Sequence, residues 1–434
     1  MTSAPRRFTA LDAAEYFFAS PRFSAALALA IVGIALCALL LRELMGWPGM
    51  IGIVATLVVL ASLSLVAQRH RIEWQGLLPI SLLVFVGWAS VSVFWSQYKW
   101  ATVGGVAYFL AITLLGIYVA LARDTIQIAR TFGDVLRFGL GLSLFLEIFS
   151  GILIDSPLGF LNISGRIANL GPIEGIFGTR NQLGIVALIA LITFGTEFRT
   201  RSVQRWTSIG SLAVAAALLA LSRSAVGIGT LAVVVVATAA LFGLRRLPAE
   251  AKRFWQVGLL VAAVAAAVAA WIERTPIITT FSASGELVTR LHLWQQLRAL
   301  IPFHNLEGWG WVGHWRQDLD PFTSFLNATS RTPTSALNAY LDVWFQVGLI
   351  GLIAFVGLLG LTFVRSWLLA SKQRSFVYAW PALVLVALII SSLAESAILV
   401  EFGWLTFVVC SVKAARELSW RNALARIEPH RIAS

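Results

Sequence analysis

Apolar stretches long enough to form membrane helices recur along this chain, and short polar connections separate them. A helix needs about 20 mainly apolar residues to cross the hydrocarbon core of a bilayer, and it satisfies its own backbone hydrogen bonds there. The pattern therefore predicts an all-α integral membrane protein. We expect twelve transmembrane helices, near residues 24–41, 50–67, 77–95, 103–121, 135–154, 181–197, 206–222, 224–243, 255–272, 339–364, 376–393 and 396–412.

The longest polar interruption, residues 273–338, is expected to form one large loop between the ninth and tenth of these helices. Composition agrees with the membrane assignment, because 58% of the residues are hydrophobic, 12% are charged and the mean hydropathy is +0.82. Globular soluble domains carry about twice that share of charged residues. Both cysteines, Cys37 and Cys410, lie in apolar stretches, so neither a disulfide nor a thiol nucleophile is expected.

The distribution of positive charge predicts the orientation in the membrane. Residues 1–23 lack the apolar core and cleavage site of a signal peptide, so we expect a cytoplasmic arm. With that arm inside, every predicted inner connection is basic, as is the cytoplasmic tail at 413–434. Both termini are then cytoplasmic and the large loop lies on the outer face. The net charge of +12 reflects this topology rather than a nucleic-acid partner.

Five cations beyond the long loop lie on the predicted outer side, against the orientation signal: Arg42, Lys99, Arg166, Arg180 and Arg223. We interpret Arg42 and Lys99 as solvated loop residues. Arg223 lies in a connection too short to leave the membrane surface, where an unpaired charge costs several kcal/mol by order of magnitude. We therefore expect a functional partner for Arg223; an interfacial arginine is the alternative.

The segment GRIANLGPIEGIFGTRNQLG, residues 165–184, contains glycines and a proline that exclude a regular helix. Arg180 and Asn181 fall at the first turn of the helix that follows. Backbone amides at a helix N-terminus together with a guanidinium form a plausible anion site. A helix-start loop with an interfacial arginine is an equally good interpretation.

The large loop is predicted to contain an amphipathic helix. Ser284 can cap it, Glu286 lies in its first turn, and Leu287, Leu291, Trp294 and Ile301 recur with helical spacing. Arg290 lies at the edge of this stripe. The following EGWGWVGHW is rich in tryptophan, which indicates either an aromatic belt at the lipid interface or a surface on which sugars stack.

Several motifs in their order resemble the O-antigen ligase/polymerase superfamily. They are GIFGTRNQLG, SRSAVG, TRLHLWQQLRALIPFHNLEGWGWVG, LNAYLDVWFQVGLIGLIAFV and SLAESAILVEFGWLTFV, and together they cover roughly residues 165–412. The resemblance implies an integral-membrane glycosyltransferase with a GT-C-like fold. Such proteins transfer a glycan from an undecaprenyl-pyrophosphate carrier to a glycan or lipid acceptor at the outer face of the plasma membrane. The resemblance implies no metal, nucleotide sugar or other cofactor.

The resemblance also implies which residues act. Arginines at the outer mouth hold the pyrophosphate, and here they correspond to Arg223, Arg290 and, less closely, Arg180. Fixed guanidinium groups stabilise the negative charge that develops on a leaving pyrophosphate. The other expected substrate-binding residues are Asn181, Arg166, Asn338, Trp294 and Trp309.

One position departs from the family pattern. Members commonly carry a His-Asn pair just before the helix that follows the loop, whereas this chain has Leu337-Asn338. Leucine cannot accept a proton from the acceptor hydroxyl. The alternatives in the loop are His292, His304, His314 and Glu307, of which we favour Glu307 as a catalytic residue because it adjoins the bend at Gly308.

Two other functions remain open. A transporter or flippase for lipid-linked sugars would need ionisable residues near the middle of the membrane and two related halves. Glu147 is the clearest deep charge, but we favour a hydrogen-bonded helix–helix contact for it, and the sequence shows no related halves. A non-catalytic protein that binds the lipid-linked glycan is the second alternative, and Leu337 favours it.

Overall fold

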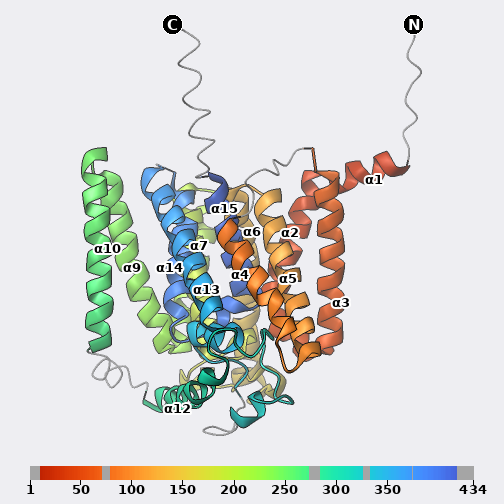
Figure 1. The fold of residues 1–434 in the computed structure, drawn as a ribbon. Coiled ribbons are helices and arrows are strands. Elements are labelled where there is room, and N and C mark those ends of the chain that lie inside the picture. The colour runs from red at the N-terminus through yellow and green to blue at the C-terminus, as the bar shows by residue number, and fades with distance from the viewer. Residues whose placement is uncertain (1–9, 71–78, 273–283, 326–332, 374, 418–434) are drawn as a thin grey trace, which may run out of the picture.

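The computed structural model describes residues 10–70, 79–272, 284–325, 333–373 and 375–417, and these residues are mostly α-helical (Figure 1). They form no β-strand apart from an isolated bridge between Leu158 and Ile163. The α-helices are α1 Ala10–Phe18, α2 Pro21–Leu36, α3 Ala38–Ala67, α4 Ile80–Val91, α5 Lys99–Ala122, α6 Thr125–Ile148, α7 Arg180–Thr200, α8 Arg205–Ser222, α9 Ala225–Arg246, α10 Ala249–Ile272, α12 Ser284–Leu300, α13 Ala339–Lys372, α14 Ala379–Ser391 and α15 Glu401–Glu417.

Seven helices in the described part of the chain are long and apolar enough to cross a membrane. The number rises to eight if α1 and α2, which meet at a bend of 53°, are counted as one span. A helix lies in each of the twelve predicted ranges, but some of these, such as α4 and α14, are apolar and short. The all-helical membrane fold is therefore confirmed, whereas twelve crossings remain a prediction.

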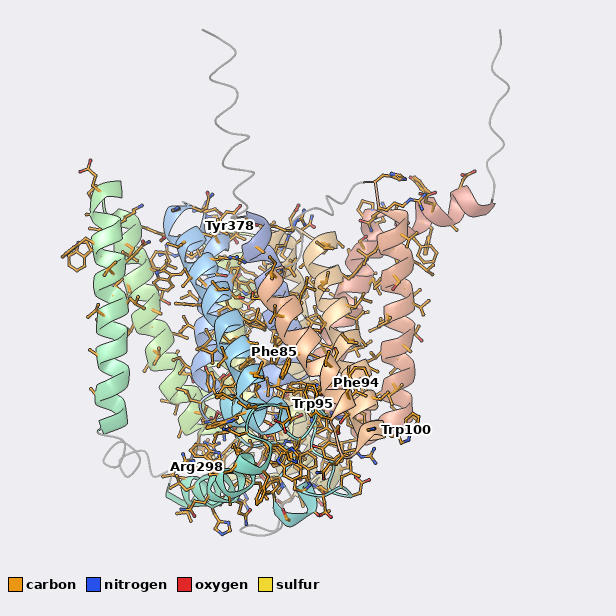
Figure 2. The ribbon with its side chains drawn as sticks, in the orientation of Figure 1. Phe85, Phe94, Trp95, Trp100, Arg298 and Tyr378 are labelled. Atoms are coloured by element: carbon orange, nitrogen blue, oxygen red, sulfur yellow. The ribbon has the colours of Figure 1, made fainter. Side chains whose placement is uncertain are left out.

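The bundle has two distinct ends. The start of α1 and the end of α15 lie at one end, and α12 lies with the neighbouring loop segments at the opposite end, called here the α12 end (Figure 1). Figure 2 shows the labelled Trp95, Trp100 and Arg298 toward the α12 end and Tyr378 at the other. The centre of the bundle is formed by apolar side chains of α5, α7, α14 and α15, and α9 with α10 stands at one side (Figure 1).

Helix α13 is broken at Val347 and Gly348, and the break fixes the polar loop that precedes it. Gly348 has a φ of +71°, so the helical ladder is interrupted there. The freed carbonyls of Phe345 and Gln346 accept hydrogen bonds from Trp309 N at 3.0 Å and Gly310 N at 2.7 Å. In return, the amides of residues 349 and 350 donate to the carbonyls of residues 305 and 306. The loop backbone thus completes the hydrogen bonding of a broken helix.

The helix predicted to start near Ser284 is present as α12, but its buried face differs from the expected one. Leu293, Leu297 and Ile301 are buried against the aromatic core of the loop, whereas Leu291 is 44% exposed. The expected stripe is therefore confirmed at Trp294 and Ile301, which pack in this core, and wrong at Leu291, because α12 packs onto the loop's own core by a row of residues four apart. The side chains of Ser284 and Glu286, proposed for the first turn, lie outside the described residues.

Candidate active site

Glu395 lies in the connection between α14 and α15 and joins two other segments of the chain. Its Oε1 accepts hydrogen bonds from Arg290 Nη2 of α12 at 2.7 Å and from Asn181 Nδ2 of α7 at 2.9 Å. The side chains of Arg290 and Glu395 are only 11% and 7% exposed. Asn181 Oδ1 in turn accepts from Ser224 Oγ at 2.7 Å. We call Glu395, Arg290, Asn181 and Ser224 the Glu395 cluster.

The local sequence places Asn181 and Ser224 at two helix starts that meet. Asn181 lies in the first turn of α7, where Thr179 caps the helix by accepting from Gln182 N at 3.2 Å. Ser224 caps α9 and accepts from Gly227 N at 2.9 Å. A Cβ atom at Gly184 would lie 2.9 Å from Ser224 Cβ, so glycine there allows the two helices to approach. Both cluster members are therefore fixed by backbone geometry.

Two of the predicted arginines directly precede cluster members in the chain. Arg180 is the first residue of α7 and is partly buried. Arg223 ends α8 in the left-handed region, with a φ of +46°, and its backbone amide donates to Ala220 O. The Arg223 side chain is exposed and forms no ion pair with any residue that the structure describes. Its guanidinium is thus available to an anionic ligand.

The irregular segment before α7 is anchored on α6. The Oε1 atom of Glu147, a fully buried side chain, accepts from Glu174 N at 2.9 Å and Gly175 N at 2.8 Å. The helix–helix contact expected for Glu147 is therefore wrong: its partners are backbone amides of the loop. Ile173 N donates to Leu221 O at 3.3 Å, which brings the segment beside the end of α8. Arg166 is exposed in this segment.

Asn338 fixes the start of α13 next to the Glu395 cluster. Its Oδ1 accepts from Tyr340 N and Leu341 N at 3.0 and 3.1 Å, and its Nδ2 donates to Leu393 O at 3.0 Å. These bonds cap the helix and hold it against the segment that leads to Glu395. The preceding Leu337 adopts a left-handed φ of +51°.

Trp294 ties α12 to the same region, because its Nε1 donates to Ala336 O at 2.9 Å. Together with the Arg290–Glu395 pair, this bond holds α12 over the start of α13. Of the residues proposed from the sequence, Arg290, Asn181, Asn338 and Trp294 thus take part in one connected set of contacts.

Glu307 and Trp309 contact a different part of the molecule. Glu307 Oε1 lies 3.0 Å from His304 Nδ1, and the Glu307 carbonyl accepts from Trp95 Nε1 at 3.0 Å. The Trp309 ring packs edge-to-face on His304, with centroids 4.5 Å apart, beside the break in α13. Glu307 and Trp309 thus contact residues at this break rather than the Glu395 cluster.

Three functional candidates escaped the sequence interpretation: Glu395, Ser224 and Asp342. Glu395 is the single charged residue within residues 379–400, which is the signal that could have identified it. Asp342 is 1% exposed, and its Oδ1 accepts from Trp315 Nε1 at 2.9 Å and Gln346 Nε2 at 2.7 Å. Asp342 therefore joins the loop to α13.

The interpretation of Arg42 as a solvated loop residue is wrong. Its Nη1 lies 2.7 Å from Glu401 Oε1 and its side chain is 15% exposed, because α15 begins directly beside it. Lys99, in contrast, is exposed as expected.

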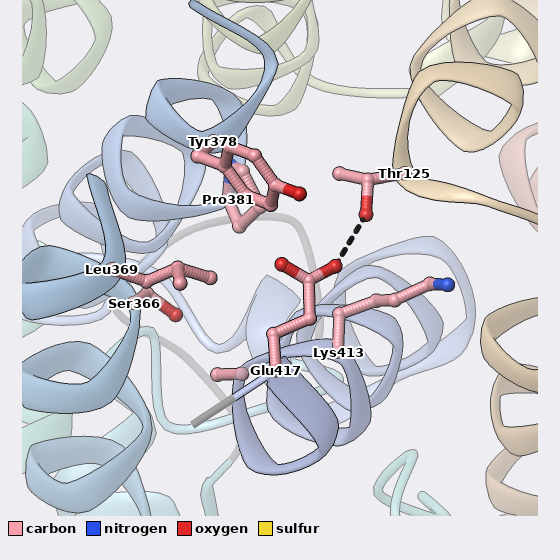
Figure 3. Close-up of a pocket in the computed structure, with 8 residues that line it drawn as sticks. Thr125, Ser366, Leu369, Tyr378, Pro381, Lys413 and Glu417 are labelled. Atoms are coloured by element: carbon pink, nitrogen blue, oxygen red, sulfur yellow. Dashed lines mark hydrogen bonds between the residues drawn. The ribbon is translucent and has the colours of Figure 1, made fainter. Parts of the chain in front are cut away.

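A small pocket is lined by residues that include Tyr378 (Figure 3), which lies at the end of the bundle opposite α12 (Figure 2). Thr125 Oγ1 there donates to Glu417 Oε1 at 3.0 Å, and Lys413 lies nearby. Within the described residues no group of three or more His, Cys, Asp or Glu side chains could hold a metal ion.

Residues 209–356 match a family model described as O-Antigen ligase. The match begins within α8, spans Arg223, Ser224, Arg290 and Asn338, and ends within α13. Asn181 and Glu395 lie on either side of it in the sequence. A search of curated proteins found no match.

Proposed function

We propose that this chain, which residues 209–356 place in the O-antigen ligase/polymerase superfamily, is a polysaccharide ligase or polymerase of the outer face of the plasma membrane. It transfers a glycan from an undecaprenyl-pyrophosphate carrier to a glycan or lipid acceptor. The observation that carries the proposal is the convergence of Arg290, Asn181, Ser224 and Glu395 from four separate segments. Arg290 and Ser224 lie in the matched region, and Asn181 and Glu395 lie outside it.

The arginines suit a leaving pyrophosphate. A guanidinium has five N–H donors, so Arg290 can keep its bond to Glu395 and still donate to phosphate oxygens. Arg223 is exposed and without an ionic partner among the described residues, and Arg180 begins α7, whose N-terminal dipole also favours an anion. Arg290 and the start of α7 are fixed before the reaction, so they stabilise the charge that develops as the bond to the sugar breaks.

In the proposed reaction, an acceptor hydroxyl oxygen attacks the anomeric carbon of the carrier-linked sugar. A new C–O bond forms, the bond from that carbon to the pyrophosphate oxygen breaks, and the electron pair leaves with the pyrophosphate. The hydroxyl proton passes to a carboxylate. Asn181 and Ser224 are positioning residues, because they fix Glu395 and the start of α7.

Glu395 is the carboxylate that we assign as proton acceptor in place of Leu337. It lies against Arg290, whereas Glu307 contacts His304 and Trp95 at the break in α13. The Asn338 side chain bonds Leu393, so the segment that carries Glu395 adjoins the position where relatives commonly have histidine. A carboxylate on this segment can serve the hydroxyl that such a histidine would serve.

The test is glycan transfer by the purified protein in nanodiscs, with lipid-linked glycan extracted from cells that lack the gene. Arg290→Ala and Glu395→Gln should each lower the initial rate at least 100-fold. The control is Arg316→Ala, a change in another loop arginine whose pair with Asp318 is exposed. Wild-type rates in both site variants would refute the assignment of the site.

Deletion of the gene separates the remaining alternatives. Lipid-linked repeats should accumulate facing outward, without polymer or conjugate. Repeats that accumulate facing inward would instead indicate a flippase. A deletion strain with normal polysaccharide that still loses a glycan-binding activity would indicate a non-catalytic protein.

A further inference from the structure

A second polar and aromatic cluster lies outside the proposed transfer site. It comprises Arg42 and Trp47 of α3, Tyr108 of α5, His314 of the loop and Glu401 of α15, and we call it the Trp47 cluster. These residues come from four separate segments. Helix α3 is broken beside it at Gly46, whose φ is +71°.

One oxygen of Glu401 contacts polar atoms of three other residues of this cluster. Oε1 lies 2.7 Å from Arg42 Nη1, 2.8 Å from His314 Nε2 and 3.2 Å from Tyr108 Oη. The other oxygen, Oε2, has no hydrogen-bond partner among the described residues and is not among the buried atoms sealed from solvent. An acceptor atom thus remains available to a ligand.

The hydrogen bonding of the cluster is incomplete. Arg42 Nη1 is also 2.7 Å from His314 Nε2, so three polar atoms lie in mutual contact. The imidazole nitrogen either donates to Glu401 or accepts from Arg42, and it cannot do both. One of the three contacts is therefore not a hydrogen bond: it joins either two N–H donors, Arg42 and His314, or two acceptors, His314 and Glu401. A ligand hydroxyl can donate to the Glu401 carboxylate and accept from the Arg42 guanidinium, which gives each of these groups a further hydrogen bond.

Trp47 supplies an apolar face beside these polar atoms. Its side chain is 45% exposed, and the Arg42 guanidinium carbon lies 4.9 Å from its ring centroid. The rings of His314 and Tyr108 meet it edge-to-face at 5.8 and 5.9 Å, which fixes its orientation. An exposed, immobilised indole is suited to stacking on the C–H face of a ligand ring.

The backbone at Glu401 is strained, because this residue has a φ of +26° at the first position of α15. A non-glycine residue in that region is strained and persists where the surrounding structure holds it. Here the strain directs a carboxylate that is 7% exposed toward Arg42 and His314.

The mixture of charges indicates the class of ligand. The Glu401 carboxylate would repel a phosphate, and the Arg42 guanidinium would repel a metal cation. An uncharged ring with several hydroxyl groups suits both, since hydroxyls donate and accept and the ring stacks on Trp47. That combination is a sugar ring.

We propose that the Trp47 cluster binds a sugar ring of the glycan substrate, as a subsite separate from the Glu395 cluster. The assignment rests on the proposed glycan transfer for the identity of that glycan. The two clusters are joined by the short segment through Ala397–Leu399. Six residues of chain span at most about 20 Å, so one short oligosaccharide can reach both.

Binding of two probes to the purified protein in nanodiscs tests the proposal. The first probe is the oligosaccharide that mild acid releases from the cell's own lipid-linked glycan, measured by saturation-transfer NMR. The second is undecaprenyl pyrophosphate, which carries no sugar, measured by calorimetry. Trp47→Ala and Glu401→Gln should weaken oligosaccharide binding at least tenfold, and Trp47→Phe, which keeps an aromatic ring, should retain most of it.

Trp100→Ala is the matched control, because Trp100 is an 89% exposed tryptophan toward the α12 end (Figure 2). It should bind the oligosaccharide as the wild type does. Unchanged oligosaccharide binding by Trp47→Ala, or no binding by the wild type, would overturn the subsite. Arg290→Gln reports separately on the transfer site: if it binds undecaprenyl pyrophosphate normally, the pyrophosphate assignment fails whatever the Trp47 variants do.

Discussion

Replacement of the Arg290–Glu395 pair should separate its structural role from its chemical one. Both side chains are nearly buried, at 11% and 7% exposure, and their closest atoms are 2.7 Å apart. Removing one partner of a buried pair typically costs about 3–5 kcal/mol, because the other charge stays buried without compensation. Replacing both with apolar residues of similar size is often close to neutral.

We therefore expect Arg290→Leu and Glu395→Leu each to lower the free energy of unfolding by a few kcal/mol. Arg290→Leu keeps the hydrogen bond from Asn181 Nδ2 to Glu395, so the loss of unfolding free energy should lie toward about 3 kcal/mol, the lower end of this range. The double variant should recover most of the loss, so the coupling between the two positions should reach at least about 3 kcal/mol, the upper end of the usual range for residues in contact. Glycan transfer should remain lost in all three variants.

The assay is a double-mutant cycle on unfolding in detergent, followed by fluorescence-detected size exclusion, together with the transfer rate of each variant in nanodiscs. Stability losses that simply add in the double variant would refute the buried pair as described. A double variant that regains transfer would refute a chemical role for both residues, even if the stability coupling is found.

Three further outcomes follow from the structure. Gly348→Ala should destabilise the protein by more than 1 kcal/mol and release the loop to proteolysis, because a Cβ there would overlap the Leu306 carbonyl; limited proteolysis that matches wild type would contradict the docked loop. Asn338→Ala should lower the free energy of unfolding by about 1 kcal/mol, because the α13 cap is lost, and should lower the transfer rate, because the bond to Leu393 is lost. Asn338→Asp should restore the cap but not the bond that Nδ2 donates. Thermal unfolding and transfer rates measured in parallel would show whether the two effects separate. Leu337→His should raise the rate of a Glu395→Gln variant if position 337 adjoins the acceptor hydroxyl, and an unchanged rate would show that it does not.

The apolar pattern was sufficient to predict the helices, since a helix lies in each of the twelve expected ranges. Helix-start rules, helical spacing and the family resemblance proposed Arg290, Asn181 and Asn338, which the structure places on a helix face or at helix starts. Glu395 was missed because a lone carboxylate in an apolar stretch can be recognised as part of a site only when its partners are known. Those partners are 105 and 214 residues away along the chain, and no local rule connects them.

The tryptophans of the loop before α13 were expected to form either an aromatic belt at the lipid interface or a surface on which sugars stack, but their packing favours another role. Trp311 and Trp315 are buried, and Trp309 lies at the break in α13. Backbone bonds to residues 345–350 hold the loop in place even though it contains few regular elements.

This rigidity has a consequence for the proposed chemistry. Asp342, near the start of α13, accepts a hydrogen bond from the indole of Trp315, and the neighbouring His314 belongs to the Trp47 cluster. Asn338, which caps α13, donates to the carbonyl of Leu393 near Glu395. One helix start therefore sets the positions of both clusters. A glycan bound across the two would be oriented by groups that are already fixed, so little binding energy would be spent on ordering the loop.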